Sequence, residues 1–275
     1  MLILGYISSF IMGTLLGLIG AGGSILTVPI LFYFFGQDAI FATTNSLFVV
    51  GIAALVGAAI QAKKGDINIK IGMYFAIPSF VGIYIARYFL LPSLPNIIIS
   101  DFGITLTKPL LVMIVFSIIM TFSSWAMIRS KNPLPEGSPK LNTISPNILS
   151  IGFKGLLVGT ITGFVGAGGG FLIIPALVIL LKFPIRQAIG TSLSIIAANS
   201  LFGFAISFRL EQVENCPLLL TICSLGIAGM FLGQNLSERV NERYLKSSFG
   251  YFALVVASLI LWDQGLKLLL PKVLH

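Results

Sequence analysis

Two short glycine-rich segments, one in each half of the chain, carry the residues best suited to bind a solute. The first is Gly17–Pro29 (GLIGAGGSILTVP) and the second is Gly163–Pro175 (GFVGAGGGFLIIP). Glycine relaxes the limits on φ and ψ and, lacking a Cβ, lets another group approach the main chain. A helix that restarts after such an interruption presents free N–H groups and the positive end of its dipole. The chemistry indicated is binding of an oxyanion by the main chain.

The two segments are copies of one another. Each position of the first is matched 146 residues later (163 minus 17), and the register continues to Gly57 and Gly203. We call residues 20–24 the first glycine knot and residues 166–170 the second. In a membrane, irregular backbone is tolerated only where it is buried in protein or lines a cavity, and paired interruptions in two halves point to a transporter's binding site. The alternative is that these glycines only allow close helix packing, which we predict for the single pair Gly13 and Gly17.

The composition is that of a polytopic helical membrane protein. The 275 residues are 56% hydrophobic and 9% charged, whereas soluble domains carry about 25% charged residues. Long apolar runs, each able to cross a hydrocarbon core of about 30 Å, recur along the chain. The net charge of +8 comes from basic residues spread singly or in pairs through short loops, which is typical of membrane topology signals. We therefore expect a lipid bilayer as the surroundings and no nucleic-acid partner.

Most enzyme chemistry is excluded by the residues that are missing. The only histidine is His275, so a Ser-His or Cys-His pair cannot form within the membrane, and zinc sites built on histidine are excluded. The knots match neither a P-loop nor a dinucleotide-binding motif. Cys216 and Cys223 are too few for a disulfide framework or a metal cluster. The sequence predicts no enzyme, no catalytic residue, no metal and no cofactor.

The predicted fold is all-α, with two repeats that each contain a broken helical hairpin and three transmembrane helices. The runs 2–35 and 148–181 are too long for one helix across a bilayer, so each is expected to fold back at its knot. The remaining spans are 39–61, 71–91, 104–128, 185–208, 216–236 and 247–270. The first membrane repeat is 1–128 and the second is 148–275, and a polar, proline-rich linker joins them at 129–147.

The distribution of basic residues predicts that the two repeats are inverted relative to one another. If each broken hairpin enters and leaves on the same side, the loops at 62–70, 129–154, 182–186 and 237–246 share one face and hold 12 of the 17 basic residues. If each broken run crosses once instead, the best split is 10 to 7. The first arrangement agrees better with the positive-inside rule, and it makes the halves inverted repeats.

Polar residues follow the knots at equivalent positions. Asn45 and Ser46 in the first half match Thr191 and Ser192 in the second, and their side chains could contact a substrate or cap the adjoining helix. The predicted substrate-binding residues are Gly20, Ala21, Gly22, Gly23, Ser24, Asn45, Ser46, Gly166, Ala167, Gly168, Gly169, Gly170, Thr191 and Ser192. Two restarting helices that face each other near the midplane would then hold an anion without a buried lysine or arginine.

Other polar residues within the spans have simpler interpretations. Gln61, Asn199 and Gln234 are predicted to form hydrogen bonds between helices. Arg87, the only basic residue well inside a span, is predicted to extend its side chain to the membrane surface, with attraction of anions at an entrance as the alternative. No Asp or Glu lies deep in a span, which excludes a buried proton relay. A coupling ion, proton or sodium, would use an edge carboxylate, the substrate's own protonation or main-chain carbonyls.

At the paired knots the sequence resembles the sulfite exporter TauE/SafE family of membrane transporters. The matching residues are Gly17-x-x-Gly20-Ala21-Gly22-Gly23…Pro29, Gly163-x-x-Gly166-Ala167-Gly168-Gly169-Gly170…Pro175 and Ala188-Ile189-Gly190-Thr191-Ser192-Leu193. In the first half, Asn45 replaces the Thr of the family's Ala-Thr-Ser-Leu. The spacing of the spans fits over nearly the whole chain. The resemblance implies transport of anionic sulfur compounds, such as sulfite and organosulfonates, or of small organic acids.

The sequence therefore predicts a secondary transporter, a permease or exporter, for a small anion. Its substrate would be a sulfur oxyanion, an organosulfonate or a small organic acid, moved across a bacterial inner (plasma) membrane by rocking of one inverted half against the other. The alternatives are a passive anion channel and a membrane scaffold that transports nothing. The sequence leaves open the substrate, the direction of transport, the coupling ion and the oligomeric state.

Overall fold

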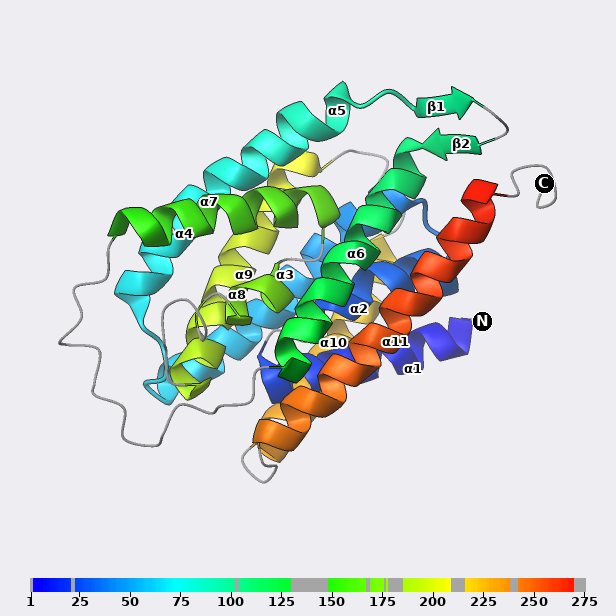
Figure 1. Ribbon diagram of the computed structural model, residues 1–275. Helices are drawn as coiled ribbons and strands as arrows, with labels where there is room; N and C mark the ends of the chain where they lie inside the picture. Colours follow the sequence, from blue (N-terminus) through cyan, green and yellow to red (C-terminus); the bar gives the residue numbers. More distant parts are fainter. Residues whose placement is uncertain are drawn as a thin grey trace.

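Helices make up almost all of the part of the protein that the computed structural model describes (Figure 1). That part comprises residues 2–20, 23–101, 104–129, 148–166, 169–175, 177, 185–208, 216–237 and 242–269. Within it, six helical segments are long and apolar enough to cross a membrane: Leu2–Ile19, Ala39–Lys63, Ile69–Ser93, Lys108–Trp125, Gln187–Ser207 and Pro217–Ser237. The predicted class, an all-α polytopic membrane protein, is confirmed.

The elements follow one another in two series. The first half contains α1 (Leu2–Ile19), α2 (Ser24–Pro29), the π-helix η1 (Ile30–Phe34), α3 (Ala39–Lys63), α4 (Ile69–Tyr84), the π-helix η2 (Ile85–Leu90), α5 (Leu91–Ser93), β1 (Ile97–Asp101), β2 (Ile104–Thr107) and α6 (Lys108–Arg129). The second half contains α7 (Ile148–Val165), α8 (Gly170–Pro175), α9 (Ile185–Ser207), α10 (Cys216–Ser237) and α11 (Glu242–Leu269).

The helices of the two halves keep the register of the repeated sequence. The bounds of α7 and α8 lie 146 residues after those of α1 and α2, and α9 begins 146 residues after α3. The second half's α10 corresponds to the continuous segment formed by α4, η2 and α5, and α11 corresponds to α6. The repeat seen in the sequence is therefore also a repeat of structure.

The first broken run folds back on itself, as predicted. A Cβ at Gly5, near the start of α1, would lie 2.8 Å from the ring of Phe35, which follows η1. At the other end of the hairpin, Gly23 packs against the main chain of Met12 in α1. The limb formed by α2 and η1 therefore returns to the end of the bundle from which α1 starts.

Glycine-lined faces join each half to the other. The helix α1 packs along α10, and its equivalent α7 packs along α4. A Cβ at Gly13 of α1 would collide with the carbonyl oxygen of Gly226 in α10, and a Cβ at Gly159 of α7 would collide with the carbonyl oxygen of Ser79 in α4. Gly17 likewise packs on the main chain of α10. The packing role predicted for Gly13 and Gly17 is confirmed, and it follows the general use of small residues between membrane helices.

The third helices of the two halves, α3 and α9, cross at the centre of the bundle (Figure 1). Gly57 of α3 packs on Leu193 of α9, whereas Leu47, earlier in α3, packs on Gly203, later in α9. Residue numbers rise in one helix as they fall in the other, so the pair is antiparallel. Because α3 and α9 are equivalent, one half runs in the opposite direction to the other along the bundle. The inversion of the two repeats across a membrane stays a prediction.

A two-stranded antiparallel sheet is a part of the fold that the sequence did not predict. Strands β1 and β2 pair from Ile97 opposite Thr107 to Asp101 opposite Ile104. They lie at the end of the bundle where α1 begins and α11 ends (Figure 1). The second half has no room for such a segment, since α11 begins 134 residues after α6 begins and the repeat spacing is 146. The sheet is thus an insertion in the first half.

The polar linker predicted at 129–147 lies outside the described residues, except for Arg129 at the end of α6. The division of the chain into repeats 1–128 and 148–275, with this linker between them, stays a prediction. The packing described above nevertheless couples the two repeats closely, because α1 packs on α10 and α4 packs on α7. Neither repeat forms these contacts by itself.

The close contact at Gly159 predicts a large difference between two glycine substitutions. Gly159→Val introduces a side chain where the main chain of Ser79 already lies, and overpacking of this kind costs about 1–3 kcal/mol. Gly265→Val, the matched control in α11, meets open space because nothing lies within 4 Å of its Cβ position. Thermal unfolding of the detergent-purified variants should show a clear loss of stability for Gly159→Val only. Equal melting temperatures would contradict the packing of α7 on α4.

The predicted inversion can be tested by topology reporters. A reporter fused after His275 is expected on the outer face, and a reporter inserted after Lys64 is expected in the cytoplasm. A pair of enzymes that are active on opposite sides of the membrane measures both positions. A cytoplasmic C-terminus would refute the inverted arrangement.

Candidate functional site

Both glycine knots begin with the same backbone turn at a helix end. Gly20 (φ +81°) follows α1, and Gly166 (φ +77°) follows α7. Each donates its N–H to the carbonyl oxygen four residues earlier, Gly20 to Leu16 and Gly166 to Thr162, at 2.8 Å. Glycine is common at this position because other side chains are disfavoured at positive φ. The first glycine of each knot therefore ends a helix and begins the return of the chain.

Each knot packs against the first turns of the third helix of the opposite half. Gly20 lies against Ile189 in α9, and Gly166 lies against Thr43 in α3. Since Ile189 and Thr43 are themselves 146 residues apart, equivalent residues make this contact in both halves of the chain. Ser46 donates its hydroxyl to the carbonyl oxygen of Gly166. The structure thus brings the second knot together with the polar cluster of the first half.

The two knots do not face each other near the midplane, so this part of the prediction is wrong. Gly190, next to Ile189, packs against Gln61 near the end of α3, whereas Thr43 is near its start. The 18 residues from Thr43 to Gln61 span about 27 Å of helix at 1.5 Å per residue. The antiparallel pairing of α3 and α9 causes this separation, because it carries the equivalent first turns to opposite ends of the bundle. Between the knots, α2 and α8 contact each other.

The remaining knot residues fall into two groups. Ala21, Gly22, Ala167 and Gly168 lie outside the described residues. The others are buried at the starts of α2 and α8: Gly23, Ser24, Gly169 and Gly170. Their binding of an anion through the main chain stays a prediction.

Asn45 and its neighbours form a buried polar cluster at the start of α3. The Asn45 amide donates to Oε1 of Gln37 at 3.0 Å, but Asn45 Oδ1 and Gln37 Nε2 have no partner among the described residues. The N-cap of α3 is Asp38, whose carboxylate accepts the N–H of Ile40 at 3.0 Å. Capping is therefore done by Asp38, and the amide pair is left with free hydrogen-bonding capacity.

In the second half, the equivalent residues form hydrogen bonds with other groups of the protein. Thr191 and Ser192 are fully buried. The Thr191 hydroxyl accepts the N–H of Asn68, the N-cap of α4, at 3.0 Å, and Ser192 donates to the carbonyl oxygen of Ile189 at 2.8 Å. The structure places these two residues beside the first knot, but Thr191 also supports the start of α4.

A cavity of about 480 Å³ lies beside Thr191, between α3, α4 and α9. Its wall is largely apolar, with Asn68, Thr191 and Ser194 as its polar side chains. Lys63, the last residue of α3, and Lys64, which follows it, lie near this cavity, and both are exposed. This cavity lies at the end of α3 that is remote from Thr43.

The basic residue Arg87 is buried at the other end of α3, which corrects the prediction that it extends to the membrane surface. Only 8% of Arg87 is exposed. Its guanidinium donates to the Thr44 hydroxyl at 2.8 Å and to the Thr43 carbonyl oxygen at 3.4 Å, and its Nε has no partner. Among the described residues, no carboxylate forms a hydrogen bond or an ion pair with it. Arg87 is thus a buried cation held by neutral groups next to the second knot.

The sequence contained one signal for this site. Arg87 is the only basic residue well inside a span, and ionisable residues within membrane helices usually face the protein interior and mark functional sites. Its direction could not be read from the sequence, because the π-helix η2 (Ile85–Leu90) changes the rotation of the residues around the helix axis.

Two of the three other single polar residues, Asn199 and Gln234, form hydrogen bonds between helices, as predicted. Asn199 of α9 donates to the Ser79 hydroxyl of α4 at 2.7 Å, and Gln234 of α10 donates to the carbonyl oxygen of Gly57 in α3 at 3.5 Å. Gln61 is buried against α9. Within the described ranges, no group of three or more His, Cys, Asp or Glu residues is placed to hold a metal ion.

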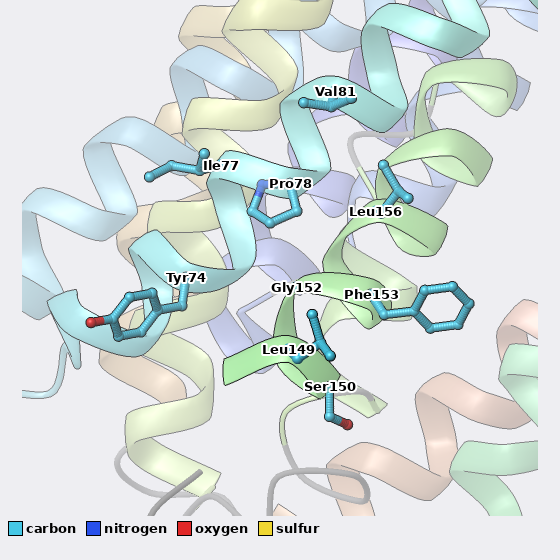
Figure 2. A pocket seen from close by; sticks show the side chains of 9 residues that line it. All are labelled: Tyr74, Ile77, Pro78, Val81, Leu149, Ser150, Gly152, Phe153 and Leu156. Carbon is cyan, nitrogen blue, oxygen red and sulfur yellow. The ribbon is translucent and has the colours of Figure 1, made fainter. Parts of the chain in front are cut away.

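A groove between α4 and α7 is a different kind of surface (Figure 2). It has a volume of about 1160 Å³, with Ile77, Val81 and Phe153 among the side chains that line it. Phe153 and Leu149 are 61% and 82% exposed. A wall of exposed apolar side chains suits acyl chains, so we do not place the anion site here.

Two halves of equivalent helices, with buried polar groups where the helices are interrupted, define a polytopic membrane protein with an internal polar site. The sequence profile of the family described as "Sulfite exporter TauE/SafE" matches residues 6–260. The chain belongs to this family, as the knots indicated.

Relatives from bacteria and archaea cover nearly the whole chain. A probable membrane transporter protein of Xylella fastidiosa (strain Temecula1) is 27% identical over 264 residues, which are 95% of each chain. One of Methanocaldococcus jannaschii is 27% identical over 278 residues, 96% of this chain and 94% of the relative. A third, from Bacillus subtilis, is 25% identical over 258 residues, 92% and 96% of the two chains. No solved structure matches the chain significantly. The protein is therefore a multi-pass membrane transporter.

The two equivalent glycines that end α1 and α7 predict unequal effects of alanine. Alanine at either position costs about 1–2 kcal/mol for its left-handed backbone. At Gly166 the new Cβ also collides with the main chain of Thr43, whereas at Gly20 it meets a side-chain methyl of Ile189. Thermal unfolding should therefore show a greater loss of stability for Gly166→Ala than for Gly20→Ala. The reverse order would contradict the packing of the second knot on α3.

Proposed function

We propose that the protein is a secondary transporter that moves a small anion across a bacterial inner membrane. The substrate class is a sulfur oxyanion, an organosulfonate or a small organic acid. The family description names sulfite, and the relatives carry the name of membrane transporters. Membership in the family supports transport, and the chemistry of the site supports an anion.

The single observation that carries the anion is the buried guanidinium of Arg87. A charged side chain within the membrane is costly, at about 3 kcal/mol even on the mildest insertion scales. Here the described partners of Arg87 are two neutral oxygens, from Thr43 and Thr44. Such a group is retained in proteins when a partner of opposite charge binds to it. An anionic substrate is that partner in our proposal.

Two of the predicted site residues are connected to this cation through Thr43. Gly166 packs on Thr43, to which Arg87 donates, and Ser46 binds the carbonyl oxygen of Gly166. We assign the second knot, from Gly166 to Gly170, and the cluster of Asn45 and Ser46 to the binding of the anion at this end. The first knot, from Gly20 to Ser24, and the pair of Thr191 and Ser192 form the equivalent region at the other end.

The arrangement of the two halves supports alternating access. Equivalent contacts between knot and third helix are made at both ends of the antiparallel pair α3 and α9. In transporters with inverted repeats, rocking of one repeat against the other opens a site to each side in turn. For proton coupling we assign the edge carboxylate of Asp263, which accepts hydrogen bonds from Tyr33 and Gln264, both at 2.8 Å.

Transport can be measured with purified protein in liposomes. We expect concentrative uptake of at least one of sulfite, methanesulfonate, thiosulfate and acetate when a proton or sodium gradient is imposed. Gly22→Leu and Gly168→Leu should abolish this uptake, because a side chain in a knot blocks approach to the main chain. Gly265→Leu, which has open space around its Cβ position, is the matched control.

The outcomes separate the alternatives. A flux that only dissipates an anion gradient would indicate a passive channel. A folded protein that binds and moves no anion would indicate a scaffold. Normal uptake by both knot variants would refute the assignment of the knots to the site.

A further inference from the structure

We propose that Arg87 binds the transported anion directly and that its site prefers anions with one negative charge to anions with two. This inference rests on the proposed function. It adds the charge of the preferred ligand and the residue that selects the ligand by that charge. The family description and the names of the relatives specify neither.

The first step is the unused hydrogen-bonding capacity of Arg87. A guanidinium has five N–H donors in a planar fork that matches the two oxygens of a carboxylate or sulfonate. In the described structure one Nη donates to Thr44 and the other to Thr43. The Nε of this buried side chain, which is only 8% exposed, has no hydrogen-bond partner among the described residues. A bound oxyanion would satisfy Nε and a free Nη hydrogen together, which is the usual bidentate geometry.

The second step is that this positive charge has no counterpart in the other half. The repeat position of Arg87 is Gly233, where a Cβ would collide with the carbonyl oxygen of Thr14. The repeat position of Thr44 is Gly190, where a Cβ would collide with the carbonyl oxygen of Asp66. Neither place can hold the long side chain of a second arginine. Among the described residues, Arg87 is the one charged side chain classed as buried.

The third step is the electrostatic balance of the occupied site. A buried ion is tolerated when a partner neutralises it, and the penalty for uncompensated charge is large where water is excluded. One guanidinium and one monoanion form a neutral pair. A dianion would leave one negative charge uncompensated in the same place, since the nearby side chains of Thr44, Asn45 and Ser46 are neutral. The site therefore favours sulfonates, carboxylates and singly protonated oxyanions such as hydrogen sulfite.

Thr44 is a positioning residue in this arrangement. Its hydroxyl accepts from Arg87 and donates to the carbonyl oxygen of Ile40 at 3.1 Å, so it fixes the orientation of the guanidinium. Thr44→Val keeps the shape of the side chain and removes this hydrogen bond. Thr44→Ser restores it.

The preference is tested by uptake into proteoliposomes at mildly acidic and mildly alkaline pH. Methanesulfonate is a monoanion and sulfate a dianion at both values, whereas sulfite changes from hydrogen sulfite to the dianion as pH rises. We expect methanesulfonate to compete with the labelled substrate at least about tenfold more strongly than sulfate, which corresponds to about 1.4 kcal/mol. The apparent affinity for total sulfite should fall at alkaline pH, while that for methanesulfonate stays constant and controls for effects of pH on the protein.

Variants connect the preference to Arg87. Arg87→Gln should lower uptake of every monoanion at least about tenfold, whereas Arg87→Lys should keep the preference for monoanions with a higher KM. Thr44→Val should raise KM, and Thr44→Ser should return it toward the original value. Lys154→Gln removes a basic residue from α7 and serves as the control with unchanged uptake. Melting temperatures of the purified variants identify any that are unfolded, and for those the Thr44 pair provides the test.

Two results would overturn the inference while leaving the proposed function intact. One is equal competition by sulfate and methanesulfonate in a protein that transports anions. The other is a folded Arg87→Gln variant with unchanged KM and selectivity. If the original protein moves none of the anions, the proposed function fails and this inference fails with it.

Discussion

Close approach of main chains at glycine is the interaction on which the rest of the structure depends. In α1 and α7 the glycines face the main chains of α10 and α4, so each half is held by a helix of the other. Lipid tails offer no hydrophobic gain for this association, and close packing supplies the attraction instead. Because the contacts are reciprocal, the position of each knot is set by the opposite half. The buried polar groups can then occupy fixed places within a largely apolar bundle.

The irregular backbone of the knots shows how that packing accommodates polar atoms. Backbone N–H and C=O groups inside a membrane must find partners within the protein. The N–H groups of Gly20 and Gly166 donate to the last turns of α1 and α7, and the carbonyl oxygen of Gly166 accepts from Ser46. At the second knot, a polar side chain of α3, the helix on which the knot packs, supplies this hydrogen bond.

Much of this architecture could be predicted from the sequence, because it follows from patterns along one chain. The repeat, the apolar spans and the return of the first hairpin at its knot follow from glycine spacing and from the length of a membrane-spanning helix. The separation of the knots could not be predicted, since it depends on how α3 pairs with α9. The burial of Arg87 also needed the structure, because η2 alters which way that residue faces. The sheet of β1 and β2 lies in a segment with no partner in the repeat, so symmetry gave no information about it.

The sheet inserted between α5 and α6 has an energetic consequence for a molecule made of two related halves. In the proposed alternating-access cycle, identical halves would give two conformations that are related by a two-fold rotation and are therefore equally populated. The sheet contacts α6 and α11 at one end of the bundle only. In the proposed cycle, these one-sided contacts would favour the conformation that retains them.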